Sequence, residues 1–285
     1  MLTEKKLNTA TVDLNYMEGP DSGPPLLLLH GITQRWQAFV QVIPALTESY
    51  HLFALDFRGH GRSGRVKNSY RGEDFASDAL ALIDQVIGKP PIIFGHSLGG
   101  MVSLYLSAKH PGRVRAQALG DSIIFGTDFA GTVLVSMFTQ VRDIVAANLG
   151  FEGLQRAIPE MCLESPIFGR VAFKNFPGCD DAYLSAWAKS LSLLDPDVLT
   201  MTLSGESFRG WDAADFIKRI QCPTLLIQAD PKMAGLTTDN DVAQIKAACP
   251  GVQHARIAGI GHALHMLDAP PVVRALTNFL CTLDL

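Results

Sequence analysis

Residues 91–99 read PIIFGHSLG, and this stretch decides the fold. An apolar run leads into a Gly-x-Ser-x-Gly pentapeptide, and apolar residues at helical spacing follow it from 101 to 108. This context predicts a strand, a sharp turn and a helix, with Ser97 at the apex of the turn. The backbone of such a serine is strained, so the residues two before and two after it have to be small, and Gly95 and Gly99 meet that demand. We predict that Ser97 is a nucleophile; a helix start after a glycine-rich turn is the plainer alternative.

Short apolar runs alternate with helical stretches on both sides of this segment. Strands are expected at Thr9–Met17, Pro25–His30, His51–Leu55, 91–94, Arg115–Leu119, Pro223–Gln228 and Val252–Ile257, and helices at Glu73–Ile87, after Ser97, at Asp241–Ala248 and at Pro271–Leu280. Strands that alternate with helices indicate βαβ units, a mostly parallel sheet and right-handed crossovers. The sequence therefore predicts an α/β fold.

The segment from 123 to 212 interrupts this alternation. It is rich in Phe, Leu and Met and contains no clear strand run. We interpret it as a helical lid (cap) inserted between two strands of the sheet, with a few of its aromatic side chains facing a pocket between lid and sheet. The predicted domains are thus a core formed by 1–122 and 213–285 and a lid formed by 123–212.

Composition limits the class of protein. The 285 residues carry a net charge of −4 and contain no dense run of Lys and Arg, which argues against nucleic-acid binding. The five cysteines are scattered without a C-x-x-C pair, as expected of free thiols in a reducing compartment. The longest aliphatic run, Leu26–Leu29, is too short to span a bilayer. We expect a soluble cytoplasmic monomer or homodimer that acts on a small-molecule substrate, with an exported protein as the alternative.

A serine hydroxyl is a weak nucleophile at neutral pH unless a base accepts its proton, and histidine is the usual base. Of the eight histidines, His262 has the best setting, because it follows the strand-like run ending at Ile257 and is preceded by Gly261. His265 lies toward an expected helix start, and His96 is expected to point away from the pocket. We therefore predict His262 as the base.

Two aspartates qualify as the carboxylate that orients this imidazole. Asp121 follows the run at 115–119 and Asp230 follows the run at 223–228, so both stand at strand ends and both satisfy the chain order Ser…Asp…His. Either one could instead be a turn aspartate that bonds its own backbone. Asp239 and Asp241 look like helix-start residues.

Acyl transfer also needs hydrogen-bond donors for the oxyanion of the tetrahedral intermediate. The backbone N–H of Leu98 follows the serine at a helix N-terminus and is one natural donor. The second is expected from the loop after the Leu26–Leu29 strand, where Gly31 lets the backbone turn inward, and we predict the N–H of Ile32. No metal or cofactor is implied.

The order of these motifs resembles the α/β-hydrolase family over nearly the whole chain apart from the lid. His30-Gly31, Asp56–Ser63, Gly95–Gly100 and Gly261-His262 carry the resemblance. It implies an α/β-hydrolase fold, with a mostly parallel sheet, helices on both faces and an inserted helical lid. It also implies a serine nucleophile at 97, a base at His262, and oxyanion donors at Ile32 and Leu98.

The chain departs from the commonest family pattern at the acid, which that pattern places near Lys232. A known variation places the acid after the strand that precedes the lid, where Asp121 stands. We favour Asp121 and keep Asp230 as the alternative acid.

The combined interpretation is a serine hydrolase that cleaves a small carboxylic ester, lactone or related acyl substrate through an acyl-enzyme on Ser97. Amide or C–C bond hydrolysis with the same triad is an alternative, as is a ligand-binding signalling protein on the same fold. Arg35, Arg170 or Lys174 could bind a substrate carboxylate, although each is more often a solvated surface charge.

Overall fold

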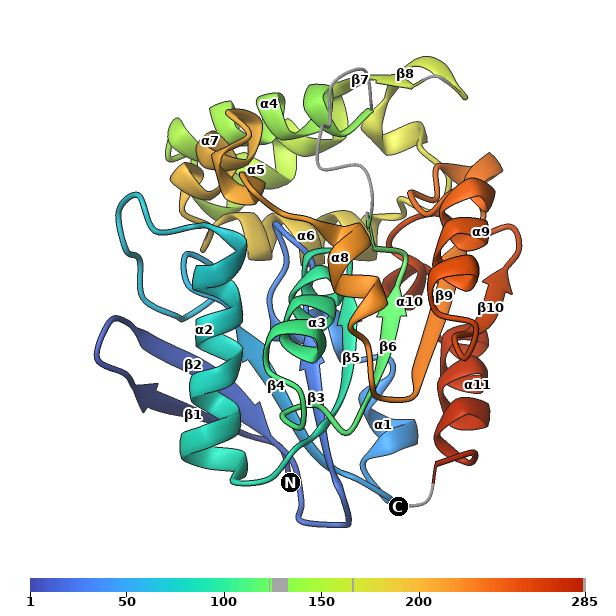
Figure 1. The fold of residues 1–285 in the computed structure, drawn as a ribbon. Coiled ribbons are helices and arrows are strands. Elements are labelled where there is room, and N and C mark those ends of the chain that lie inside the picture. The colour runs from blue at the N-terminus through green and yellow to red at the C-terminus, as the bar shows by residue number, and fades with distance from the viewer. Residues whose placement is uncertain (123, 125–132, 166, 284–285) are drawn as a thin grey trace.

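Eight strands form one twisted sheet, and helices cover both of its faces (Figure 1). The computed structural model describes residues 1–122, 124, 133–165 and 167–283. In spatial order the strands are β1 (Thr3–Asn8), β2 (Asp13–Glu18), β4 (His51–Asp56), β3 (Pro25–Leu29), β5 (Ile92–His96), β6 (Ala116–Gly120), β9 (Thr224–Ala229) and β10 (Gln253–Ile257). The strands from β4 to β10 in this order pair in parallel, whereas β1 and β2 pair antiparallel.

The helices divide between the two faces of the sheet. One face packs on α2 (Gly72–Leu82), α3 (Leu98–Lys109), α8 (Ala213–Lys218) and α9 (Asp239–Ala248), and the other on α1 (Ile43–Leu46), α10 (Leu264–Leu267) and α11 (Ala269–Leu280). The alternation of side-chain directions along β3 shows why helices cover both faces. Leu27 and Leu29 belong to the cluster with α2 and α3, while Leu26 and Leu28 belong to the cluster with α1 and α11. A strand buried on both faces needs apolar side chains at every position, which is what this run supplies.

The structure confirms the predicted α/β-hydrolase class and differs from the sequence interpretation in three places. The expected edge strand at Thr9–Met17 is a hairpin of β1 and β2, because the mostly polar β1 gives little apolar signal. The helix expected at Glu73–Ile87 is α2 followed by one π-helical turn at Ile83–Ile87. The region interpreted as purely helical contains a small hairpin of β7 (Cys162–Ser165) and β8 (Gly169–Ala172).

The elements between β6 and α8 lie mostly above the edge of the sheet where the parallel strands end (Figure 1). They are α4 (Val133–Ala146), α5 (Gly150–Ala157), the β7–β8 hairpin, α6 (Asp181–Leu191) and α7 (Pro196–Leu203), with short 3-10 turns between them. We call the described residues 133–212 the lid. The predicted start of the lid at residue 123 lies outside the described residues, and the domain boundaries stay a prediction.

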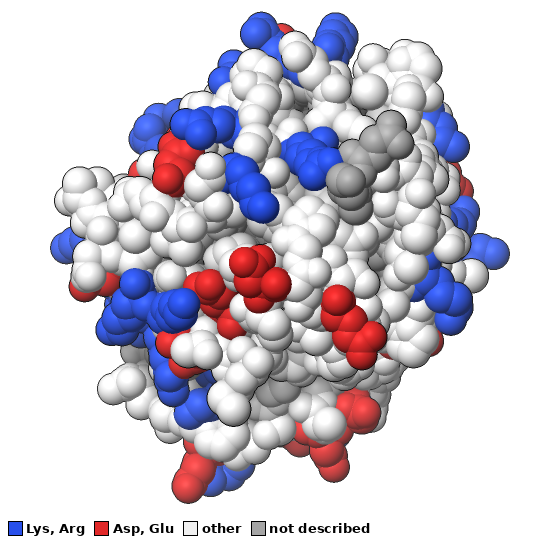
Figure 2. All heavy atoms as spheres, turned by 90° about the horizontal axis from the view of Figure 1, so that it is seen from below, with Lys and Arg blue, Asp and Glu red and all other residues white. Residues whose placement is uncertain are grey.

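The face of the molecule around the two chain ends carries both signs of charge in separate small groups (Figure 2). Exposed pairs such as Arg113–Asp84, 2.8 Å apart, are typical of such a mixed surface. A continuous basic surface, which nucleic-acid binding requires, is not seen on the described part of this face. Among the helices of residues 1–122, 133–165 and 167–283, none has both the length and the hydropathy that a bilayer crossing demands.

The close packing of Gly99, the second residue of α3, generates a prediction for stability. A Cβ on Gly99 would collide with the carbonyl oxygen of Leu29, a backbone atom that cannot move aside. Gly99→Ala should therefore lower the free energy of unfolding by about 2 kcal/mol or more, measured by urea denaturation. Gly251→Ala is the matched control, because its Cβ would meet only open space and its backbone is not left-handed. A change of more than about 0.5 kcal/mol in the control, or none at Gly99, would contradict this account.

Candidate active site

Ser97 stands on the sharp turn between β5 and α3, in the conformation that the pentapeptide predicts. Its φ of 51° and ψ of −114° lie outside the regions that L-residues favour. Three backbone hydrogen bonds hold the turn: the N–H of Ser97 donates to Gly120 at 2.9 Å, and its carbonyl accepts from Gly100 and Met101. A Cβ on Gly95 would collide with the carbonyl oxygen of Gly99, so close backbone contact requires both small residues. The strain thus presents the hydroxyl above the sheet edge.

Asp121 and His262 are brought together by the ends of neighbouring elements. Nδ1 of His262 lies 2.7 Å from Oδ2 of Asp121, which is fully buried, while the His262 side chain is one quarter exposed. With Nδ1 donating to the carboxylate, the neutral imidazole has Nε2 free as an acceptor. Among the described residues neither this Nε2 nor the Ser97 hydroxyl has a hydrogen-bond partner, and both residues line the same cavity.

The Asp121 carboxylate is also held by backbone donors. It accepts from the N–H of Ala229 at 3.1 Å, of Leu236 at 2.8 Å and of Thr237 at 3.1 Å. Together with His262 this makes four donors and no acceptor around the group, a set that only an acceptor such as a carboxylate satisfies. The loop after β9 is thereby fixed to the end of β6.

The Asp230 carboxylate forms a different set of hydrogen bonds. Its carboxylate accepts from the N–H of Lys232 at 3.0 Å and of Gly259 at 2.8 Å, and these bonds hold its pKa below the usual range. It therefore caps a short turn and joins it to the loop after β10, which is the turn role that its sequence setting left open. In the described part of the chain His262 bonds to Asp121 and not to Asp230.

The two predicted oxyanion donors lie beside the serine. Leu98 is the first residue of α3, and Ile32 follows β3 in a loop that Gln34 braces by accepting from the N–H of Gly31 at 3.0 Å. Both line the cavity with Ser97. Across the described backbone neither N–H donates to a carbonyl in a turn or loop, so both are available to a ligand oxygen. The next residue, Thr33, accepts from Nε1 of Trp187 at 3.0 Å and ties the lid to this loop.

His96 is placed differently from the sequence interpretation. It lines the cavity instead of pointing away, with Nδ1 3.2 Å from Gln34 Oε1 and Nε2 2.9 Å from the carbonyl oxygen of His262. A neutral imidazole has one N–H to donate, and the shorter contact is the one to His262. Strand alternation predicts opposite directions for neighbouring side chains, but the left-handed φ of Ser97 ends that alternation. His96 therefore bridges the Ile32 loop, the serine turn and the His262 loop. Nothing in the residue pattern alone indicates this bridge.

Several buried histidines around the site are kept neutral. Burial lowers the pKa of His96 well below its usual value, and lowers that of His265 to about 3. Burial likewise lowers the pKa of His60 to about 3 and of His30 to about 4. His265 stacks on Phe39 with ring centroids 4.9 Å apart, and neither of its ring nitrogens has a partner in the described residues.

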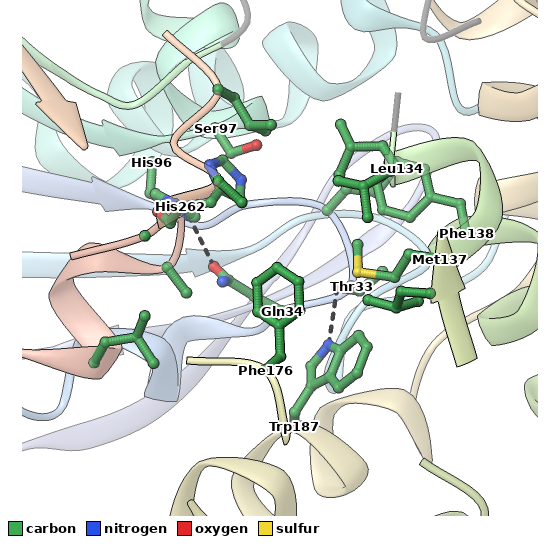
Figure 3. Close-up of a pocket in the computed structure, with 18 of the residues that line it drawn as sticks. Thr33, Gln34, His96, Ser97, Leu134, Met137, Phe138, Phe176, Trp187 and His262 are labelled. Atoms are coloured by element: carbon green, nitrogen blue, oxygen red, sulfur yellow. Dashed lines mark hydrogen bonds between the residues drawn. The ribbon is translucent and has the colours of Figure 1, made fainter. Parts of the chain in front are cut away.

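The cavity lies between the lid and the sheet edge and has a volume of about 120 Å³. Ser97, His96 and His262 occupy one end of it, and Leu134, Met137, Phe138, Phe176 and Trp187 face it from the lid (Figure 3). No group of three or more His, Cys, Asp or Glu side chains suited to a metal ion occurs among the described residues.

The three cations considered as carboxylate ligands do not line the cavity. The Arg35 guanidinium lies in the field of Asp56 and Glu4. Arg170 is mostly exposed beside Glu164, and Lys174 donates to Glu160 at 2.7 Å. The sequence alone could not assign these positions, because they depend on tertiary packing around the cavity.

A comparison with known families assigns this architecture. A family model described as alpha/beta hydrolase fold matches residues 24–269. The chain belongs to this family.

Several of the similar proteins are named as hydrolases. A 2-(acetamidomethylene)succinate hydrolase of Mesorhizobium japonicum is 24% identical over 281 residues, which is 97% of this chain and 94% of that protein. The crystal structure of an E-2-(acetamidomethylene)succinate hydrolase superposes with a TM-score of 0.76 at 21% identity, over 99% of this chain and 100% of the other. Est816, an N-acyl homoserine lactone degrading enzyme, superposes with a TM-score of 0.74 at 20% identity, over 96% and 100% of the two chains. At these identities the solved structures show the fold alone.

The unpartnered ring of His265 generates a prediction for stability. In the folded chain the pKa of His265 is about 3, so the ring stays neutral above that pH. In the unfolded chain a histidine binds a proton below about pH 6.5. Protonation therefore favours the unfolded state, and the free energy of unfolding falls as the pH decreases from about 6.5 to about 3. His265→Phe should therefore raise the free energy of unfolding by about 1 kcal/mol at about pH 7.5. The difference in the free energy of unfolding between His265→Phe and the wild type should increase by about 2 kcal/mol when the pH is lowered to about pH 5. Urea unfolding at both pH values checks this.

His30→Phe is the matched contrast, because the His30 ring accepts from the N–H of Phe57 at 3.1 Å. Removing that acceptor should destabilise the protein by about 1–3 kcal/mol at about pH 7.5. A His265→Phe advantage that is independent of pH would contradict the account given for this residue.

Proposed function

We propose that this protein is a serine hydrolase that cleaves a small carboxylic ester, lactone or related acyl substrate through an acyl-enzyme on Ser97. The observation that carries the proposal is the meeting of a strained serine, a carboxylate-bound imidazole and two free backbone N–H groups at one end of a single cavity. Each of these groups has the role that acyl transfer needs. The hydrolase names of several relatives support the reaction class.

In the proposed first half-reaction, Ser97 Oγ attacks the substrate carbonyl while Nε2 of His262 accepts the hydroxyl proton. Asp121 stabilises the imidazolium that forms. The N–H groups of Ile32 and Leu98 donate to the oxyanion, which costs no reorganisation because both are already fixed by the fold. The intermediate then collapses, and the proton on His262 passes to the leaving alcohol.

In the second half-reaction a water molecule attacks the acyl carbon and gives its proton to His262. Collapse of the second intermediate breaks the bond to Ser97 Oγ, returns the proton to the serine and releases a carboxylic acid. His96 is a positioning residue in this scheme, since its bond to the His262 carbonyl fixes the loop that carries the base.

The same groups would cleave an amide, and this is the second candidate. The Mesorhizobium relative is named for an acetamido compound, which favours testing an amide beside an ester. That compound is a succinate, and its carboxylates have no cationic counterpart among the described residues that line the cavity of this chain. We therefore propose an acyl substrate that lacks these additional carboxylates.

The first prediction of this proposal concerns Ser97. A small fluorophosphonate should form one adduct, mapped to Ser97 by intact mass and peptide analysis, and a p-nitrophenyl ester should be turned over repeatedly. Ser97→Ala should abolish the adduct and lower kcat by about 10³-fold or more. Ser49→Ala is the control, because Ser49 is an exposed serine in a turn outside the cavity, and it should behave as the wild type. Labelling without sustained turnover would instead favour the ligand-binding signalling protein.

The second prediction distinguishes the two aspartates. Asp121→Asn should lower kcat by about 10⁴-fold, because an amide cannot hold the His262 tautomer that leaves Nε2 free. Asp230→Asn should stay within a few-fold of the wild type, since its carboxylate contacts backbone N–H groups of loops and the Arg256 guanidinium at 3.8 Å, and not His262. Both variants are first compared with the wild type by circular dichroism. Similar activity of the two variants would overturn the assignment of Asp121.

A further inference from the structure

The wall of the cavity is built almost entirely of apolar side chains. Helix α4 contributes Leu134, Met137 and Phe138, and α6 contributes Trp187 (Figure 3). Aliphatic, thioether and aromatic groups of this kind bind hydrocarbon surface by burying it from water. The end of the cavity away from Ser97 is therefore suited to an apolar group.

Lysine and arginine are absent from the described part of the wall. The remaining residues of the chain do not supply one either, because 123, 125–132, 166 and 284–285 include no Lys or Arg in the sequence. The histidines that line the cavity are His96 and His262, and both are engaged in the site itself. A substrate carboxylate away from the serine would have no cation to pair with.

Most polar side chains of the wall already have hydrogen-bond partners. Nε1 of Trp187 donates to Thr33, and the Thr202 hydroxyl donates to the Val198 carbonyl at 2.9 Å. Among the described wall residues, two neutral donors without a hydrogen-bond partner remain on the lid side, the Tyr183 hydroxyl and the Cys179 thiol. Burial raises the pKa of both. An unpaired anion enclosed by such a wall loses its hydration without a compensating ion pair.

We propose that the cavity selects an uncharged, apolar acyl group, aliphatic or aromatic, and rejects an acyl group that carries a second carboxylate. This inference rests on the proposed serine hydrolase function. It names the substrate class of that site and separates this chain from a hydrolase of dicarboxylic acids.

Three p-nitrophenyl esters with the same leaving group and nearly the same chain length test it. They are the hexanoate, the hemiadipate with a terminal carboxylate, and the methyl ester of the hemiadipate, which is polar but neutral. The expected kcat/KM for the hemiadipate is about 100-fold or more below that of the hexanoate, which corresponds to about 2.7 kcal/mol. The neutral diester should stay within about tenfold of the hexanoate, so that charge and not polarity is the cause.

A gain-of-function variant provides the second measurement. Met137→Lys places a cation on the cavity wall with little change in side-chain length, and should raise the hemiadipate-to-hexanoate ratio about tenfold or more. Leu149→Lys is the matched control in the same lid, because Leu149 is 45% exposed and lies outside the cavity. The hemiadipate-to-hexanoate ratio of Leu149→Lys should equal that of the wild type. If Met137→Lys does not fold, the ratio measured for the wild type still tests the proposed charge selection.

The outcomes separate the two proposals. Formation of the Ser97 adduct with comparable turnover of hemiadipate and hexanoate would overturn the charge selection and leave the serine hydrolase in place. Absence of the adduct, with no ester turned over above the Ser97→Ala level, would overturn the proposed function and this inference together.

Discussion

The buried carboxylate of Asp121 is the constraint on which the rest of the site depends. It sits at the end of β6 and accepts hydrogen bonds from Ala229 at the end of β9, from the following loop at Leu236 and Thr237, and from His262. Because β6 and β9 are parallel neighbours, their carboxyl ends meet, and one group can close both loops. The anion is matched by fixed backbone dipoles before any substrate arrives, so orienting the imidazole needs no rearrangement.

A second constraint, the strained backbone at Ser97, has a consequence beyond the serine. The turn ends the alternation of β5, so His96 faces the cavity and its ring reaches both Gln34 and the His262 carbonyl. The loop that carries Ile32, the proposed oxyanion donor, and the loop that carries His262, the proposed base, are thereby joined through the residue next to Ser97. Backbone strain and loop position are coupled here, since relaxing the turn would also release both loops.

Sequence reasoning predicted the sheet and the elbow because both depend on local patterns: continuous apolar runs, and small residues around Ser97. It favours Asp121 over Asp230 only through the family resemblance, since both stand at strand ends and the choice depends on the path of the loop after β9. That path is fixed by tertiary hydrogen bonds that leave no periodic signal. The edge strand β1 was missed for a related reason, because its polar residues are held by pairing with β2 and not by burial.

Low charge is common to the wall of the cavity and to the layer beneath it. His96 and His265 are neutral through burial, and lysine and arginine are absent from the described wall. In such a medium Coulomb interactions are stronger than in water, so the positive charge that forms on His262 during the proposed reaction is stabilised chiefly by its partner Asp121. A fixed cation near the base would oppose that charge, and a fixed anion would compete with the carboxylate for it. The same absence of charge that favours an apolar acyl group therefore also leaves the His262–Asp121 pair as the dominant electrostatic element of the site.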